Sequence, residues 1–302
     1  MSNKDLVVKT NRLNSAVQNL TLLEARIIQL AIIDARESGK GLTISQPLTI
    51  SAERYADAFG VNKTHAYEMI KQSEDTLFNR RFSFVDSDNK LVKSRWLQQV
   101  KYLDGQGAIE IVFTDAVVKG ISRIDGAVEF FTKYFLSHTV RFKSAYSIRL
   151  YELLTQWKTA VKTPVFELQS FRGQMGVEDG KYKSIKDFKL RVLDKALSEI
   201  NEHSDIKASY EQFKKGRVIV GFSFKIKEKP QRSTGDKPFS LTEKQINHFA
   251  PLLANQVGDV QELAPAGMSM KDFEQWVKND MTNPNRLEFY RQQLPKVGFV
   301  EK

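Results

Sequence analysis

The sequence predicts an α+β protein with two tandem winged-helix (helix-turn-helix) domains and a small C-terminal helical appendage. Three observations support this fold class. The order helix, strand, helix, Gly-Val turn, helix, hairpin occurs twice, and its Gly-Val turns lie 116 residues apart, at Gly60 and Gly176. Each copy ends in alternating apolar and polar residues, as expected for the β-hairpin that flanks the second helix of a winged helix. Two more amphipathic helices follow a polar linker near the C-terminus.

The first copy begins with an amphipathic helix, TLLEARIIQLAIIDARES, in which Thr21 and Glu24 have the spacing of a capping box. A short extended piece, PLTI, comes next, and Ser51 then opens the helix SAERYADAF, for which Gly60 is a natural end. The next helix is predicted over Lys63–Asn79. After it, the strands RFSFVD, RWLQQVKYL and AIEIVFT are separated by the turns SDNK and DGQG.

The second copy has SAYSIRLYELLTQWK as its first helix, PVFEL as a short strand and SFRGQM as a short helix opened by Ser170. After Gly176 and Val177, a long helix is predicted over Lys181–Asn201, because apolar residues recur there at three- and four-residue steps. The strands DIKASYEQF and RVIVGFSFKIK follow, and the turn KKG joins them.

Apolar side chains on the inward faces of these helices are expected to form the cores. The predicted core residues are Leu23, Ile27, Leu30, Tyr151 and Leu154. Trp96 and Trp157 lie in amphipathic elements away from the positive charge, so we interpret them as packing anchors and not as platforms for stacked bases.

The positive charge of the chain is concentrated in its middle third. The whole chain has a formal net charge of +10. Residues 141–230 contain 19 basic and 11 acidic side chains, a net +8, whereas residues 1–140 carry about +2 and residues 231–302 about 0. Such a segment indicates a polyanion partner, since phosphate contacts by Lys and Arg supply most sequence-independent nucleic-acid affinity. A basic membrane-surface helix is the weaker interpretation, because it needs a broad aromatic and leucine face.

The composition excludes several kinds of chemistry. The chain has no cysteine, which rules out disulfides, thiolate catalysis and cysteine metal sites. The four histidines are too scattered to suggest a metal set, and GKG at residues 39–41 lacks the spacing of a phosphate-binding loop. We therefore expect no catalytic residue, no metal and no cofactor. Neither a secretory signal nor a membrane-spanning stretch is visible, so a cytoplasmic protein is expected.

These patterns divide the chain into four predicted parts. They are an N-terminal winged-helix domain at residues 8–135, a C-terminal winged-helix domain at residues 136–229, a linker at residues 230–239 and a helical appendage at residues 240–302. The Pro, Gly and polar content of the third part predicts the linker. Ser240 and Glu243 have capping-box spacing at the start of the appendage, whose role is unassigned.

Four blocks of sequence carry a resemblance to a known family. They are NLTLLEARIIQLAI, SRWLQQVKYLDGQGAIEIVFT, FTKYFLSHTVRFKSAYSIRLYELLTQW and KYKSIKDFKLRVLDKALSEIN. In this order they resemble the iteron-binding replication initiator (Rep) proteins of theta-replicating bacterial plasmids. RLYELL followed by DFKLRVLDKALSEIN is the most specific part. The resemblance covers roughly Val8–Lys229, so the tail from Pro230 onward lies outside it.

The resemblance implies two winged-helix domains that bind repeated double-stranded DNA sites, the iterons, at a plasmid origin. Proteins of this family help to open the origin and recruit host replication proteins, which here would be the host initiator and the replicative helicase. They often dimerise through the first domain to bind an operator inverted repeat and repress their own gene, so an equilibrium between monomer and homodimer is implied. The family has no nuclease or ATPase activity, and no membrane partner is expected.

In a winged helix, the second helix of the motif enters the DNA major groove and the hairpin tip reaches phosphate. The contacts predicted for the second domain are Lys183, Ser184, Lys186, Asp187, Lys189 and Arg191 on the helix, and Lys214, Lys215 and Arg217 at the hairpin tip. A helical wheel places Lys183 at the back of this helix, opposite its apolar stripe. Asp187 could accept from cytosine or act as a charge at a helix N-terminus. Lys189 lies near the apolar stripe and could merely snorkel, and a solvated surface helix is the alternative for the whole face.

The matching helix of the first domain has fewer charged outward positions. The contacts predicted there are Thr64, His65, Lys71, Gln72, Arg80 and Arg81. Because this face is nearly neutral, we expect it to bind DNA less tightly than the second domain or to serve another purpose.

The sequence leaves two other functions open. A transcriptional regulator would use the same fold and charges, and it differs from an initiator in that its gene alone does not sustain an origin. A tyrosine-type DNA strand-transfer enzyme needs Arg and His around a tyrosine nucleophile, and spacing picks out no such cluster among the nine tyrosines.

Overall fold

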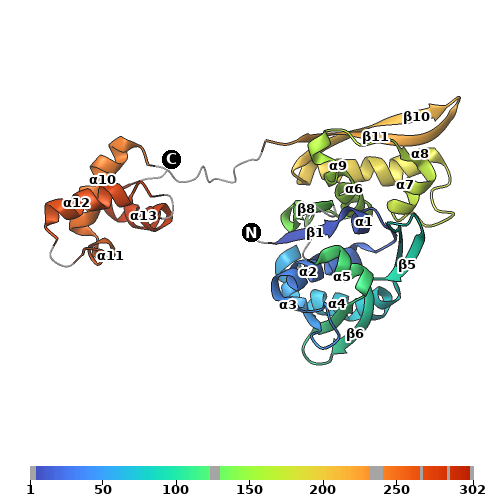
Figure 1. Cartoon of the computed structure of the whole chain (residues 1–302), viewed down its shortest axis with the longest axis horizontal. Coiled ribbons are helices and arrows are strands. Elements are labelled where there is room, and N and C mark those ends of the chain that lie inside the picture. The colour runs from blue at the N-terminus through green and yellow to red at the C-terminus, as the bar shows by residue number, and fades with distance from the viewer. Residues whose placement is uncertain (1–4, 123–129, 231–240, 266–267, 284–285, 300–302) are drawn as a thin grey trace. The chain divides into compact units, whose positions relative to one another are not determined.

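The structure is a computed structural model in which the chain forms two compact units, residues 1–230 and residues 231–302 (Figure 1). It describes residues 5–122, 130–230, 241–265, 268–283 and 286–299. The larger unit contains both winged helices, and the described part of the smaller unit contains helices and turns. None of the described helices is long and apolar enough to cross a membrane.

The first winged helix contains the helices that the sequence predicts. Its elements are α2 (Leu22–Ser38), β3 (Leu48–Ser51), α3 (Ala52–Phe59), α4 (Lys63–Asn79), β6 (Leu97–Leu103) and β7 (Ala108–Phe113). The capping box of α2 is confirmed, because Thr21 Oγ1 accepts from the backbone N–H of Glu24 and Glu24 Oε2 accepts from that of Thr21. The three strands form one antiparallel sheet in the order β3-β7-β6.

One strand predicted for this domain is wrong. The stretch RWLQQVKYL does not form a single strand, because β5 (Leu91–Arg95) pairs with β4 (Arg81–Val85) and only β6 pairs with β7. Trp96 separates the two strands, and its indole is buried in the core. The sheet β2-β4-β5 is completed by β2 (Val17–Gln18). The sequence did not predict β5, because LVKSR is largely polar and lacks a clear apolar alternation. In the structure, this strand is only partly buried.

Segments outside the two predicted copies tie the larger unit together. The strand β1 (Leu6–Thr10) pairs antiparallel with β8 (Phe131–Phe135), and the sequence predicted neither strand. The short helices of this region are α1 (Asn11–Asn14), α5 (Asp115–Ile121) and η1 (Leu136–His138). Strand β8 contacts α6 (Ala145–Thr155), so the β1–β8 pair lies next to the first helix of the second winged helix.

The second winged helix repeats the order of the first. Its further elements are η2 (Lys158–Ala160), β9 (Phe166–Glu167), α7 (Leu168–Gln174), α8 (Ile185–Phe188), the π-helical turn η3 (Lys189–Leu193), α9 (Asp194–His203), β10 (Ile206–Lys215) and β11 (Val218–Glu228). The strands form an antiparallel sheet in the order β10-β11-β9.

Two helix starts in this domain differ from the predictions. Helix α7 begins at Leu168 and not at Ser170, because the carboxylate of Glu167 caps it by accepting two backbone N–H groups. The long helix begins at Ile185 and not at Lys181, since Tyr182 has a φ of 47°, in the left-handed region that an α-helix excludes.

The smaller unit has its own hydrophobic core. Its helices are α10 (Glu243–Gln256), α11 (Gly258–Gln261), α12 (Met270–Asp280), α13 (Leu287–Gln293) and η4 (Leu294–Val297). Phe273, Val277 and Tyr290 are buried in this core. The capping box of α10 uses Thr242 with Gln245, so the predicted pair is wrong by two positions; Ser240 itself lies outside the described residues.

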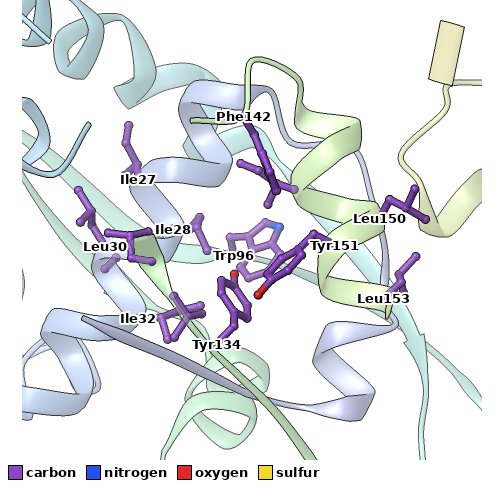
Figure 2. Packing of buried hydrophobic residues seen from close by; sticks show 14 of the residues in the cluster. Ile27, Ile28, Leu30, Ile32, Trp96, Tyr134, Phe142, Leu150, Tyr151 and Leu153 are labelled. Atoms are coloured by element: carbon purple, nitrogen blue, oxygen red, sulfur yellow. The ribbon is translucent and has the colours of Figure 1, made fainter. Parts of the chain in front are cut away.

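A single hydrophobic core runs through both winged helices of the larger unit (Figure 2). The predictions for Ile27, Leu30, Tyr151 and Leu154 are confirmed, because all four are fully buried. Leu23 is half-buried and packs against this core, as does Trp157. Burying a side chain of this size contributes about 1.5–3 kcal/mol, so this shared core strongly stabilises the larger unit.

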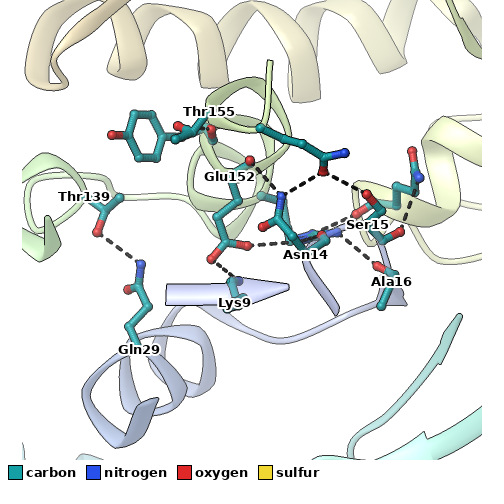
Figure 3. A network of polar contacts seen from close by, with 12 residues as sticks. Lys9, Asn14, Ser15, Ala16, Gln29, Thr139, Glu152 and Thr155 are labelled. Atoms are coloured by element: carbon teal, nitrogen blue, oxygen red, sulfur yellow. Dashed lines mark hydrogen bonds and ion pairs between the residues drawn. The ribbon is translucent and has the colours of Figure 1, made fainter. Parts of the chain in front are cut away.

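A buried ionic cluster also links the N-terminal strand to the second winged helix (Figure 3). We call Lys9, Tyr134, Arg149 and Glu152 the Glu152 cluster. Glu152 accepts from Lys9 Nζ at 2.5 Å, from Arg149 Nη1 at 2.9 Å and from Tyr134 Oη at 2.7 Å. Burial alone would raise the pKa of Glu152, but the charges of Lys9 and Arg149 outweigh it and hold that pKa below its usual range.

Arg149 extends this link across the larger unit. Its guanidinium donates to the carbonyl oxygens of Asn14, Ala16 and Gln174 at 2.8–3.0 Å. Arg149 and Glu152 lie in the RLYELL block, so the polar residues of that block hold the N-terminal segment, α6 and α7 together.

Candidate nucleic-acid interface

The helix predicted to meet DNA in the second domain consists of α8, η3 and α9, and we call it the second-domain helix. It begins where the N-cap Ser184 accepts from the backbone N–H of Lys186 at 3.2 Å. Its inward face is anchored by Phe188, whose ring centroid lies 6.2 Å from that of Phe171 and 6.1 Å from that of Phe222. The apolar stripe therefore docks on the core as predicted and leaves the opposite face in solvent.

The seven cations predicted to contact DNA in this domain have no hydrogen-bond or ion-pair partner within the part of the chain that the structure describes. They are Lys183, Lys186, Lys189, Arg191, Lys214, Lys215 and Arg217, and we call them the free cations. All are exposed except Lys189, which is half-buried, as expected for a lysine beside the apolar stripe. Asp187 is exposed, and Lys183 and Ser184 lie just before the first turn of the helix and not on its back.

Arg172 in α7 is a positioning residue that the sequence analysis missed. Its guanidinium donates to the carbonyl oxygens of Lys181 and Tyr182, and it lies 4.9 Å from the centre of the Phe188 ring. These contacts fix the turn that carries Lys183 to the start of the helix. No sequence pattern predicts that Arg172 stabilises this turn, because a single Arg on a short helix is usually solvated.

The acid Asp194 on the same helix is held by a neighbouring strand. Tyr210 Oη on β10 donates to Asp194 Oδ1 at 2.9 Å. Partial burial of Tyr210 and its bond to this carboxylate raise the pKa of the phenol to about 12, because both favour the protonated form that donates the bond. The bond ties the second-domain helix to the hairpin.

The hairpin β10–β11 presents the remaining free cations at its tip. Lys215 pairs with Val218, which leaves the two-residue turn Gly216-Arg217. Gly216 has a φ of 63°, which suits a turn with glycine at its first central position. Figure 1 shows this tip extending past the helices of the domain, and Lys214, Lys215 and Arg217 are all exposed on it.

The corresponding surface of the first domain lies on α4. Asn62 caps this helix by accepting from the backbone N–H of Thr64 at 2.8 Å. The exposed residues among the predicted contacts are Thr64, His65, Lys71, Gln72 and Arg81. The structure thus places the predicted contacts in two groups, one on each winged helix.

Two of the cations predicted as DNA contacts in the first domain interact with other residues of the fold. Arg80 Nε donates to Glu24 Oε2 at 2.8 Å, and the side chain of Glu24 is only 1% exposed. Lys71 Nζ lies 5.6 Å from the centre of the Tyr102 ring, a cation–π contact. The Arg80 guanidinium therefore stabilises the start of α2, a role that its position in the sequence did not suggest.

Comparison with known proteins agrees with this fold. Models of one family match in tandem: the model described as "Initiator Replication protein, WH1" matches residues 6–155, and that described as "Initiator Rep protein, WH2" matches residues 167–226. A replication initiation protein from Escherichia coli is 24% identical over 230 residues, which cover 73% of this chain and 69% of that protein. The PI protein from Escherichia coli is 24% identical over 272 residues, which cover 78% of this chain and 87% of that protein.

A solved structure is also similar to this one. The crystal structure of the Pi initiator protein in complex with iteron DNA superposes with a TM-score of 0.63 and 23% identity, covering 76% of this chain and all of that chain. This likeness confirms the fold of two tandem winged helices. The family models match those two winged helices in order and together cover most of the larger unit, so the chain belongs to the initiator replication (Rep) protein family.

Proposed function

We propose that this protein initiates plasmid replication by binding repeated DNA sites, the iterons, at the plasmid origin. Its family and its similarity to an initiator whose structure was solved with iteron DNA support this function. The second winged helix, assigned to residues 136–229, is the main anchor in this proposal. Its helix enters the major groove, and its hairpin tip meets the phosphate backbone.

The observation that carries the proposal is the set of free cations. A cation that is already paired must give up its partner to meet a phosphate, whereas a free cation only releases the counterions of the DNA. Lys183 lies just before the second-domain helix, and Lys186 and Arg191 lie in its N-terminal half, the part that meets base edges in helix-turn-helix proteins. Affinity should therefore be high and strongly salt-dependent.

The first winged helix, assigned to residues 8–135, has a second role in this proposal. It either occupies an adjacent groove of the iteron or pairs with another subunit, which would let a homodimer bind an operator inverted repeat and repress its own gene. The bound protein would open the origin and recruit the host initiator and the replicative helicase. It acts in the cytoplasm, as a DNA-binding protein without a catalytic step.

A titration tests the proposal. Purified protein is added to the repeats upstream of its own gene and to scrambled DNA at two salt concentrations. We expect saturable binding that prefers the repeats and weakens with salt. Equal binding to both DNAs would contradict sequence-specific recognition, and a nicked or covalently joined product would support the strand-transfer enzyme instead. A plasmid-maintenance assay then separates an initiator from a regulator, since only an initiator sustains the origin.

A pair of variants tests which domain is the anchor. Lys183→Ala combined with Lys186→Ala should weaken binding to the repeats and lower its salt dependence, because two positive charges that face the DNA are lost. Lys71→Ala in the first domain serves as the comparison and should have a smaller effect. Unchanged binding by the double variant, together with loss of binding by Lys71→Ala, would show that the first domain is the anchor.

A further inference from the structure

One apolar side chain stands among the charged residues of the second-domain helix. Leu190 is 53% exposed. Lys186 and Asp187 are exposed on the turn before it, and Arg191 is exposed directly after it. Leu190 follows the buried Phe188 by two residues, about half a helical turn, so it points away from the core. Among the described residues, Leu190 belongs to neither hydrophobic core.

The backbone at Leu190 is also unusual. The turn Lys189–Leu193 is π-helical, and the backbone N–H of Asp194 donates to the carbonyl oxygen of Lys189, five residues earlier. Single π-helical turns within α-helices occur frequently at functional sites. Here the wide turn contains the exposed Leu190 and Arg191 together with the buried Val192 and Leu193.

We propose that Leu190 contacts a base, packing against the C5-methyl group of a thymine in the iteron major groove. This inference rests on the proposed function. Thymine carries the apolar group of the major-groove edge, and the other groups there are hydrogen-bond donors and acceptors. The free cations Lys186 and Arg191 on either side of Leu190 match the negative phosphates that flank such a groove. Charge complementarity thus favours duplex DNA as the partner of this leucine over an apolar protein surface.

The contact predicts an A·T pair at a defined position of each iteron. A leucine next to a methyl group removes apolar surface from water, while a cytosine or guanine at that place would offer it polar groups. Leu190 would therefore contribute specificity, and the free cations around it would contribute affinity for any sequence.

Thymine-to-uracil replacement tests this proposal, because it removes the methyl group and keeps the base pairing. The repeats upstream of the gene are prepared with thymine or with uracil and titrated with wild-type protein and with Leu190→Ala. Wild-type protein should bind the uracil duplex about four-fold more weakly for each methyl group that Leu190 contacts, corresponding to about 0.8 kcal/mol. Leu190→Ala should bind the thymine duplex correspondingly more weakly and should lose this preference. Replacing one thymine at a time then locates the contact.

Two controls make the result specific. Leu91→Ala removes a leucine that is 64% exposed on β5, and this variant should keep the full wild-type preference for thymine. Leu190→Met keeps an apolar side chain of similar volume and should retain most of the preference. Alanine suits a helix and Leu190 is not in the core, so Leu190→Ala should unfold at the wild-type temperature.

The results distinguish failure of the methyl contact from failure of iteron binding, the proposed function on which it rests. If the wild-type protein binds the repeats specifically but does not distinguish thymine from uracil, or if Leu190→Ala keeps the whole preference, the methyl contact is disproved while iteron binding stands. If Leu190→Ala binds both duplexes as the wild type does, Leu190 makes no contact that contributes to DNA affinity. Absence of specific binding to the repeats would instead contradict the proposed function itself.

Discussion

Helix α4 and the second-domain helix hold the same place in their winged helices, but the cations around them are used differently. Near α4, Lys63 pairs with Glu53 and Arg80 pairs with Glu24, while Arg81 is exposed without a partner among the described residues. Around the second-domain helix and the hairpin tip, the free cations have no partner among the described residues. The two copies of one fold therefore differ in the share of their cations that is paired, since paired cations stabilise the protein and free cations remain available for a polyanion.

This difference separates two measurable quantities. Loss of a paired cation, or of its acid, should change the free energy of unfolding. Loss of a free cation should change DNA affinity and its salt dependence, because each phosphate contact adds about 0.9 to the slope of log affinity against log salt. A variant that changed both quantities would contradict this distinction.

The largest effect is expected at the most deeply buried pair. Glu152→Ala would leave Lys9 and Arg149 buried without their acid, and breaking a buried ion pair in this way costs about 3–5 kcal/mol of stability. Denaturant unfolding measures this loss. Glu211→Ala is the control, because Glu211 pairs with Lys162 and Lys225 on the exposed face of the hairpin and should barely shift the midpoint. Equal midpoints for Glu152→Ala and wild type would show that the cluster does not stabilise the larger unit.

The next effect concerns the hairpin tip. Changing Lys214, Lys215 and Arg217 together to Ala should weaken binding to the repeats about a hundred-fold at 0.15 M salt and lower the salt slope by about 2–3, if each cation meets one phosphate. The unfolding midpoint should not change, because these side chains have no described partner to lose.

A control for the tip lies at the other end of the same hairpin. Lys207 and Lys227 are exposed and face each other across the two strands. Changing both to Ala removes similar charge from a place far from the tip. An equal fall in the salt slope per charge removed would mean that overall charge, and not the tip, determines DNA affinity.

A smaller effect on stability is expected at Arg80. Arg80→Ala would remove the cation from the buried carboxylate of Glu24 and should cost about 1–3 kcal/mol, with the salt slope unchanged. The sequence placed Arg80 among the DNA contacts, so this variant decides between the two roles. Arg81→Ala next to it is the matched control: Arg81 is exposed, and its loss should weaken DNA binding without lowering stability.

Much of the fold could be predicted because its signals are local. The Gly-Val turns, the capping box of α2 and the alternation in β11 each depend on residues within a few positions of one another. The errors arose where distant residues decide the backbone. Arg172 binds the carbonyl oxygen of Tyr182 and so stabilises the left-handed turn before the second-domain helix, which therefore begins later than predicted. Strand β5 forms because it pairs with β4.

The candidate site was predicted in outline by its charge, but the state of each cation was not. Whether a lysine or arginine is free depends on acids far away in sequence, and Glu24 lies 56 residues before Arg80. The i,i+3 pair Arg149 and Glu152 would ordinarily face solvent on a helix, yet the N-terminal strand buries it with Lys9. Leu190 was passed over, since a charge pattern does not show which apolar residue is exposed.

The smallest change in DNA affinity is expected when one charge is added to the first winged helix, and this change tests whether that domain faces the DNA. Gln72 is exposed on α4, so Gln72→Lys gives this face a new free cation without disturbing the core. If α4 faces the DNA backbone, one added phosphate contact should strengthen binding about five-fold at 0.15 M salt and raise the salt slope by about 0.9. Gln72→Met, of similar size but uncharged, should bind as the wild type does. An unchanged slope for Gln72→Lys would remove α4 from the DNA-facing surface, and the paired cations around it would then belong to a face that serves stability or contact with another subunit.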